Sequence, residues 1–144
     1  MRLFTSIVLI VAGICLSHAN STNVSTNVST NSVPTPRWYP MQCWTYGERF
    51  AAYYTVAEAY VLDACNKTLG NRNYTEHQKA TACYNIAWNK RVDFTVALKH
   101  FPPRIFTSEE CSTRMLPIVA ICPRGGRRVF HDWKLKADPN RGVC

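Results

Sequence analysis

Apolar residues recur at the spacing of an α-helix in the segment that follows Thr45. Thr45-x-x-Glu48 is a capping-box pattern, and Gly70 is a residue that can end a helix. Between them the apolar stripe consists of Phe50, Tyr54, Ala57, Val61, Ala64 and Cys65. This spacing predicts a first helix within residues 46–69.

A second stretch repeats the same signals. Thr75-x-x-Gln78 is again a capping-box pattern. The apolar stripe that follows it consists of Ala80, Cys83, Tyr84, Ala87 and Trp88. These positions predict a second helix at residues 76–89, with the stripe buried in a core.

Beyond this point the period of the pattern changes to two. Apolar and polar residues alternate strictly over residues 91–98, which is typical of a half-buried strand. Residues 114–122 are mostly apolar and β-branched, and Pro117 among them indicates an edge strand or a bulge. A Pro-Arg-Gly-Gly turn leads into a further alternating segment at 127–135. The chain is therefore predicted to be α+β, with one or two N-terminal helices packed on an antiparallel β-sheet.

The N-terminal segments are of a different kind. Residues 1–19 have a basic Arg2, an apolar run and small residues before Ala19, as in a secretory signal peptide. A transmembrane helix is the competing interpretation, but the run is shorter than the roughly 20 residues needed to span a bilayer. Residues 20–36 repeat Ser, Thr, Asn and Val without charge, a composition that cannot form a core. We expect a disordered leader there, followed by one domain at 37–144.

Five N-glycosylation sequons accompany this layout. Asn20, Asn23 and Asn27 lie in the leader, and Asn66 and Asn73 lie in the domain. They favour a glycosylated, secreted protein. A neutral repeat that expanded by slippage is the alternative explanation of the leader.

The predicted mature chain keeps an even number of cysteines, as expected in an oxidising compartment. They are Cys43, Cys65, Cys83, Cys111, Cys122 and Cys144. We expect up to three disulfides, and the pairing favoured on loop length joins Cys43 to Cys144. Zinc ligation by cysteines is the alternative, but the chain has no Cys-x-x-Cys pair. We expect no metal, no cofactor and no cysteine nucleophile.

The charge is basic and unevenly distributed. The chain has 17 Lys and Arg against 9 Asp and Glu, and residues 99–144 hold nine of the basic residues and four of the acidic ones. Arg124, Arg127 and Arg128 crowd the predicted turn between two strands. Such a face can bind a nucleic acid, an anionic membrane or an acidic protein. A well-solvated basic surface is an equally good explanation.

Catalytic signals are sparse. His77 is expected on the surface of the second helix, His100 in a loop before Pro102, and His131 partly buried on a strand. The sequence contains no nucleophile elbow, zincin motif or glycine-rich phosphate loop. An enzyme is possible on the residues alone but unsupported.

The order of the parts resembles a known family. The residues that carry the resemblance are Cys43, Ala64-Cys65, His100-Phe101-Pro102, Leu116-Pro117-Ile118, Gly126-Arg127-Arg128-Val129-Phe130 and Cys144. This arrangement resembles the small fungal guanyl-specific ribonucleases, and more closely the ribonuclease-like secreted effectors of cereal powdery mildews. The resemblance implies a microbial ribonuclease-like fold stabilised by disulfides.

The resemblance also implies that catalysis has been lost. His100 falls near the family's first catalytic histidine and Arg127 at its transition-state arginine. The place of the catalytic glutamate, on a strand, is Met115, and the place of the second histidine is Gly142. A thioether and a hydrogen cannot move protons, so we expect no catalytic residues. If the protein is active after all, His100, Arg127 and His131 are the candidates.

The leading hypothesis is a secreted virulence effector that binds host protein or RNA, without a membrane anchor and as a monomer. Entry into host cells and detection by a plant immune receptor fit this hypothesis. The expected RNA-binding residues are Arg124, Arg127, Arg128, Lys134 and His100, with Tyr39, Trp44, Tyr46 and Trp133 able to stack bases if exposed. An active ribonuclease or toxin is the first alternative. An extracellular ligand-binding or inhibitor protein is the second.

Overall fold

The computed structural model describes residues 40–144, which form two layers. The elements are, in chain order, β1 (Gln42–Cys43), the 3₁₀-helix η1 (Ala51–Tyr53), α1 (Tyr54–Ala64), the π-helix η2 (Cys65–Leu69), β2 (Arg72–Tyr74), β3 (Lys79–Ala87), β4 (Lys90–Leu98), β5 (Arg104–Phe106), α2 (Ser108–Ile121), β6 (Gly126–Phe130) and β7 (Trp133–Arg141). Helices and an antiparallel sheet are thus both present, and the prediction of an α+β fold is confirmed.

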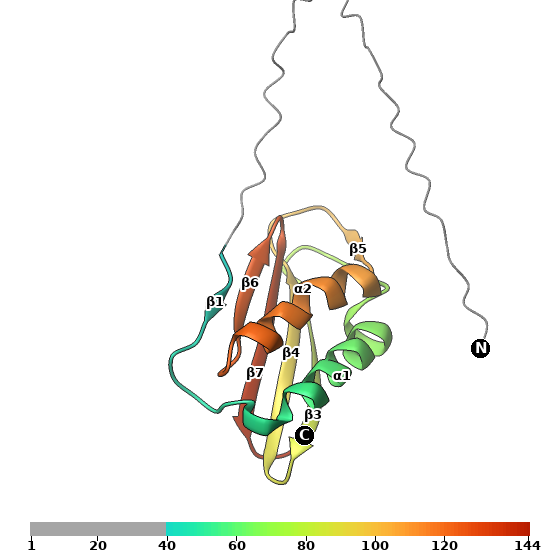
Figure 1. The fold of residues 1–144 in the computed structure, drawn as a ribbon. Helices are drawn as coiled ribbons and strands as arrows, with labels where there is room; N and C mark the ends of the chain where they lie inside the picture. The colour runs from blue at the N-terminus through green and yellow to red at the C-terminus, as the bar shows by residue number, and fades with distance from the viewer. Residues whose placement is uncertain (1–39) are drawn as a thin grey trace, which may run out of the picture. The chain divides into compact units, whose positions relative to one another are not determined.

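One antiparallel sheet forms the first layer (Figure 1). Its five strands have the order β1-β6-β7-β4-β3, so the hairpins β3–β4 and β6–β7 are joined through the β4–β7 pair. A short ribbon of β2 and β5 forms a second, two-stranded sheet. Because β4 and β7 are both long and lie inside the sheet, they supply most of its buried face.

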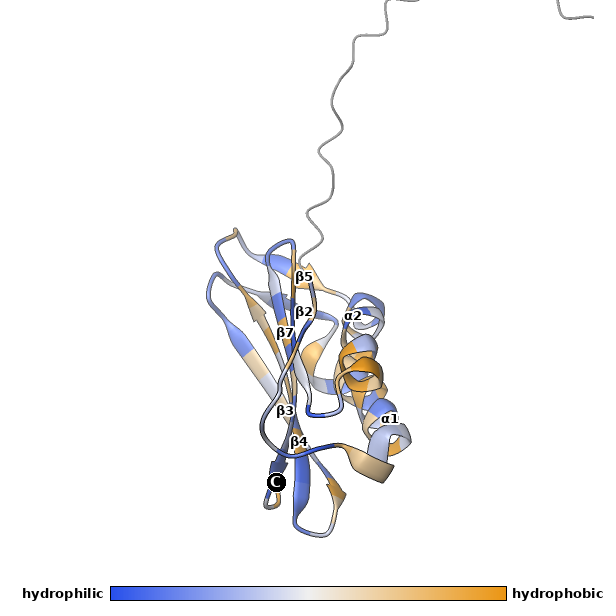
Figure 2. Ribbon diagram, turned by 60° about the vertical axis from the view of Figure 1, so that its left-hand side comes forward, coloured by the Kyte–Doolittle hydropathy of each residue, from blue (hydrophilic) through white to orange (hydrophobic). Residues whose placement is uncertain are grey.

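The core lies between this sheet and the two helices, which cover the same face (Figure 2). The residues buried there include Val92, Phe94, Val96 and Leu98 of β4, Trp133, Leu135 and Ala137 of β7, Ala57, Val61 and Ala64 of α1, and Cys111, Met115, Ile118 and Val119 of α2. Strand residues alternate between two faces and helix residues repeat every three to four positions, so each element buries one side. No described helix covers the opposite face of the sheet.

An aromatic cluster attaches the β2–β5 ribbon to this core. The rings of Phe106 and Trp133 lie 4.4 Å apart, and the rings of Tyr74 and Trp133 lie 5.2 Å apart in an edge-to-face arrangement. The Tyr74 hydroxyl donates a hydrogen bond to the Leu69 carbonyl oxygen at 2.7 Å. Burial raises the pKa of Tyr74 to about 12. Trp133 is fully buried, so the exposure that base stacking would require is absent.

The first predicted helix and the predicted strand at 91–98 are confirmed by α1 and β4. The predicted second helix at 76–89 is wrong, because this segment contains β3. Its capping-box residues form a turn instead, in which the Thr75 backbone N–H donates to Gln78 Oε1 at 2.8 Å. Pairing with β4 along the whole length of β3 outweighs the local helical signal.

The predicted strand at 114–122 is also wrong, because these residues belong to α2. Thr107 caps this helix by accepting a hydrogen bond from the Glu110 backbone N–H at 3.1 Å, and acidic residues in the first turn complement the helix dipole. The residues that α2 buries recur at helical spacing and are Cys111, Met115, Ile118 and Val119. Pro117 lies inside the helix rather than in an edge strand.

The segment predicted as one strand at 127–135 instead contains parts of two strands, β6 and β7, which form a hairpin. β6 ends at Phe130, and β7 begins at Trp133 after a turn in which His131 has a positive φ of 45°. Phe130 and Trp133 are paired and both face the core, so the turn between them interrupts the alternation predicted for one continuous strand. His131 is exposed and not partly buried.

All six cysteines of residues 40–144 form disulfides, as predicted from their even number. The pairs are Cys43–Cys122, Cys65–Cys111 and Cys83–Cys144. The expected Cys43–Cys144 bond is wrong, because β1 and β3 lie at opposite edges of the sheet. Cys43 pairs with Cys122 at one edge, and Cys144 with Cys83 of β3 at the other.

In the part of the chain that the structure describes, no helix has the length and apolar character needed to cross a membrane. The expected signal peptide at 1–19, the leader at 20–36 and the sequons at Asn20, Asn23 and Asn27 lie outside the described residues, as does Tyr39. Asn66 and Asn73 are both exposed.

Candidate binding face

The uncovered face of the sheet carries polar side chains in cross-strand rows. One row crosses all five strands and consists of Gln42, Arg127, Lys136, Thr95 and Thr81. Side chains that are directly opposite in an antiparallel pair lie on the same face, so these five form a continuous polar band. In the neighbouring row, Val129 and Lys134 are paired.

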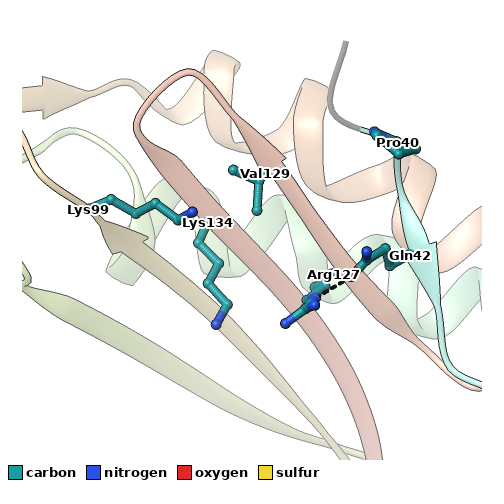
Figure 3. Close-up of a pocket in the computed structure, with 6 residues that line it drawn as sticks. All are labelled: Pro40, Gln42, Lys99, Arg127, Val129 and Lys134. Atoms are coloured by element: carbon teal, nitrogen blue, oxygen red, sulfur yellow. Dashed lines mark hydrogen bonds between the residues drawn. The ribbon is translucent and has the colours of Figure 1, made fainter. Parts of the chain in front are cut away.

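A shallow depression lies over the β1–β6–β7 side of this face (Figure 3). It has a volume of about 200 Å³ and is lined by Pro40, Gln42, Lys99, Arg127, Val129 and Lys134. Arg127 Nε donates to Gln42 Oε1 at 2.5 Å, which fixes the arginine beside β1. The Lys99 backbone N–H donates to the Asp132 carbonyl oxygen at 2.8 Å, which holds the loop after β4 next to the β6–β7 turn.

Three of the lining side chains are cationic: Lys99, Arg127 and Lys134. Within residues 40–144 none of them forms an ion pair with a carboxylate, whereas Lys136, which is opposite Arg127 in the same row, pairs with Asp138 at 2.6 Å. The lining contains no carboxylate, imidazole or hydroxyl group. Such a site can donate hydrogen bonds to oxygen atoms and attract an anion.

An indole ring lies next to the polar band. Trp44 follows Gln42 by two positions, and its backbone N–H donates to the Gly125 carbonyl oxygen at 3.0 Å, which continues the course of β1. Lys136 Nζ lies 5.0 Å from the centre of the Trp44 ring. Trp44 is partly exposed, so its ring can contact a bound ligand.

The family glycan binding domain Y3 matches residues 57–144. The chain belongs to the glycan binding domain Y3 family. The match begins in α1 and includes β3, β4, α2, β6 and β7. No curated protein matches the chain. The resemblance to ribonuclease-like effectors stays a prediction.

In this Y3 domain the predicted RNA-binding residues do not form one patch. Arg127 and Lys134 line the depression. Arg128 is paired with Leu135, and both positions belong to the face of the sheet that the helices cover. The Arg124 guanidinium donates to the Gly47 carbonyl oxygen, and His100 lies near Glu76. RNA binding by these residues stays a prediction.

The candidate catalytic residues of the Y3 domain are not assembled either. Met115, the expected place of a glutamate on a strand, is fully buried in α2 and not on a strand. The contacts of His100 are with Glu76 and His77, not with Arg127 or His131. Gly142 follows β7 with a positive φ of 100°.

Sequence reasoning missed Gln42 and Lys99 as site residues. Gln42 comes to the site through the pairing of β1 with β6, and Lys99 through a backbone hydrogen bond to the β6–β7 turn. Lys99 could have been suspected, because it continues the outward-facing positions of the strand at 91–98. Gln42 had no such signal, since the two residues of β1 are too few to show a period.

Tyr84 and Asp63 have shifted pKa values but lie on the helix side of the sheet. Burial, together with a hydrogen bond to Asp63 at 2.9 Å, raises the pKa of Tyr84 to about 12. Lys67 and Tyr84 hold the pKa of Asp63 below its usual range. These groups connect α1 to β3 and have a structural role.

Proposed function

We propose that this protein binds a glycan that carries an anionic group, at the depression on the uncovered face of the sheet. The observation that carries the proposal is the set of three cations, Lys99, Arg127 and Lys134, around one depression of a domain whose family is named for glycan binding. The proposed role is binding without conversion of the ligand, and it is supported by the lack of a carboxylate, imidazole or hydroxyl group in the lining.

The chemistry of the face suits a sugar. Gln42 and Arg127 can donate hydrogen bonds to hydroxyl and ring oxygens, and the free N–H groups of the guanidinium can hold a carboxylate or sulfate in a bidentate pair. Trp44 can pack against the apolar face of a pyranose ring. The cations make a sulfated sugar or a uronic or sialic acid a better ligand than a neutral sugar.

The direct test is binding of the protein to an array of neutral, sulfated and carboxylated glycans, followed by calorimetry on the best ligand. Arg127→Ala should weaken binding by about tenfold to a hundredfold, because a hydrogen bond to a charged group contributes about 1.5–3 kcal/mol. The matched control is Arg49→Ala, which removes the same charge from an exposed residue away from the depression. Binding should also weaken as salt screens the charges.

Equal binding to neutral and anionic glycans would overturn the anionic preference. An equal loss of affinity in Arg49→Ala and Arg127→Ala would overturn the site, because only net charge would then matter. Absence of any glycan ligand, with RNA retained, would favour the second candidate described next.

RNA is the second candidate ligand, because the same three cations can contact phosphates. Gel retention of labelled single-stranded RNA over a salt series would measure it. RNA retention that Arg127→Ala reduces, and that an anionic glycan does not compete away, would support an RNA-binding effector. RNA cleavage would support an active ribonuclease instead.

We also propose that the protein is secreted and acts outside the producing cell, as an effector or as an extracellular binding protein. Three disulfides fit an extracellular protein. Recovery from culture medium with an N-terminus at Asn20 would support cleavage after Ala19. Retention of an uncleaved chain inside the cell would contradict secretion.

A further inference from the structure

Three exposed side chains that belong to two separate loops meet at one end of the sheet. The Glu76 Oε1 atom lies 3.6 Å from His77 Nε2 and 3.6 Å from His100 Nδ1. One ligand atom from each residue can be chosen so that all three lie within 4.8 Å of one another. The two imidazole rings are almost perpendicular, at 89°, with their centres 4.7 Å apart.

Backbone hydrogen bonds hold the two loops in register. The His77 N–H donates to the Lys99 carbonyl oxygen at 3.2 Å, and the Leu98 N–H donates to the Gln78 carbonyl oxygen at 3.0 Å. His77 also has a positive φ of 61°, a conformation that an L-residue adopts at a cost when the surrounding structure requires it. The three side chains are thus brought together by the main chain and do not depend on a ligand for their proximity.

The set of donors suits zinc. Two imidazole nitrogens and one carboxylate oxygen form a known protein zinc site, with bonds of about 2.0–2.2 Å and a fourth position open to another ligand. In a tetrahedron with such bonds the ligand atoms lie about 3.4 Å apart. The 3.6 Å separations from Glu76 are close to this value, and rotation of exposed imidazoles can close the remaining distance.

We infer that Glu76, His77 and His100 form a Zn²⁺-binding site that connects the turn before β3 to the loop after β4. The six cysteines of residues 40–144 are all in disulfides and do not compete for the ion. His100 directly follows Lys99, which lines the depression, so the ion would add positive charge close to the proposed glycan site. The inference stands on its own geometry and does not require that the protein bind a glycan.

The test is calorimetric titration of the full chain, oxidised and without a histidine tag, with ZnCl₂. We expect one Zn²⁺ per chain, and Co²⁺ in its place should give the visible absorption of a four- or five-coordinate ion. His77→Asn should weaken Zn²⁺ binding by at least about tenfold, since it removes a ligand. Asparagine tolerates a positive φ, so this variant should keep the fold.

His131→Asn is the matched control. His131 is also an exposed histidine with positive φ, in the neighbouring β6–β7 turn, and it is not part of the cluster. This variant should bind Zn²⁺ as the parent does. Glu76→Gln, which keeps the size of the side chain, should weaken binding and remove the Co²⁺ spectrum, with thermal unfolding as the check of the fold.

Absence of heat and of a Co²⁺ spectrum in the parent would overturn the inference and leave the cluster as contacts between Glu76 and the two histidines without a metal. Unchanged affinity in His77→Asn would overturn it as well, because the ion would then bind elsewhere. An equal loss in His77→Asn and His131→Asn would indicate non-specific binding to surface histidines.

Discussion

Substitution of Met115 by glutamate separates the observed fold from the ribonuclease comparison. That comparison places Met115 on a strand at a catalytic position, where a glutamate would be tolerated. In the structure Met115 is fully buried on the core side of α2. We therefore expect Met115→Glu to unfold the domain or to destabilise it severely at neutral pH.

The magnitude follows from burial. A fully buried carboxyl group without a partner has its pKa raised by about 3–5 units, which places the folded pKa above pH 7, so the group must take up a proton on folding; from an ordinary pKa of about 4.3 this costs about 3–4 kcal/mol at pH 7. Loss of the buried methionine adds about 1.5–3 kcal/mol. The sum is comparable with the whole unfolding free energy of a domain, about 5–15 kcal/mol.

Urea unfolding of the parent, Met115→Glu and Met115→Leu at pH 7 and pH 4 measures this effect. Met115→Leu nearly conserves volume and should cost less than about 1.5 kcal/mol. The pKa of the introduced carboxyl is higher in the folded than in the unfolded state, so the loss of stability from its charge is small below the unfolded pKa and grows as the pH rises from the unfolded toward the folded pKa. Relative to the parent, Met115→Glu should therefore lose less stability at pH 4 than at pH 7.

The reasoning would be refuted if Met115→Glu were within about 1 kcal/mol of the parent at pH 7. Such a result would mean that position 115 has access to water and that α2 does not bury it. Restored RNA cleavage in this variant would go further and support the catalytic position that the ribonuclease comparison assigns.

Two further predictions concern stability. Tyr74 has a folded pKa of about 12 against an ordinary value of 10, so the parent should lose stability between these pH values as the unfolded state loses its proton first. Tyr74→Phe should lower the unfolding free energy at neutral pH by about 1 kcal/mol, because it removes the hydrogen bond to Leu69. Urea midpoints should show that this variant loses less stability than the parent at alkaline pH. An equal alkaline loss in the two proteins would exclude Tyr74 as the cause of that loss. Replacing Cys83 and Cys144 by serine should lower the unfolding free energy by about 2–4 kcal/mol, because this bond closes a sequence separation of 61 residues. An unchanged urea midpoint for the double variant would contradict that account.

The sequence predicted elements well where local pattern and tertiary structure agree. The strand at 91–98 alternates strictly because β4 lies inside the sheet with one face in the core. The first helix was predicted by buried positions at helical spacing, whereas the Thr45-x-x-Glu48 pattern does not cap it, because α1 begins at Tyr54 without a side-chain cap. Predictions failed where a short apolar segment was compatible with both periods, as in β3 and α2.

The candidate site was less predictable than the fold. Arg127 and Lys134 could be chosen from the charge of the C-terminal half. Nothing in the sequence distinguished them from Arg128, whose strand position belongs to the opposite face of the sheet, which the helices cover. The difference is one position in a strand, and a shift of one residue moves a side chain to the other side of the sheet. The zinc cluster depends likewise on the contact between two loops that the β3–β4 pairing brings together.

The amino-acid sequence by itself determined the α+β class, the formation of disulfides by the six cysteines from Cys43 onward, and the basic character of the C-terminal half. These follow from composition and from local periodicity, which need no knowledge of distant contacts. Only the tertiary structure decided which cysteines pair, which face each arginine occupies and which side chains surround the depression. Those properties depend on strand order and register, and strand order places β1 and β3 at opposite edges of the sheet although no local pattern indicates it.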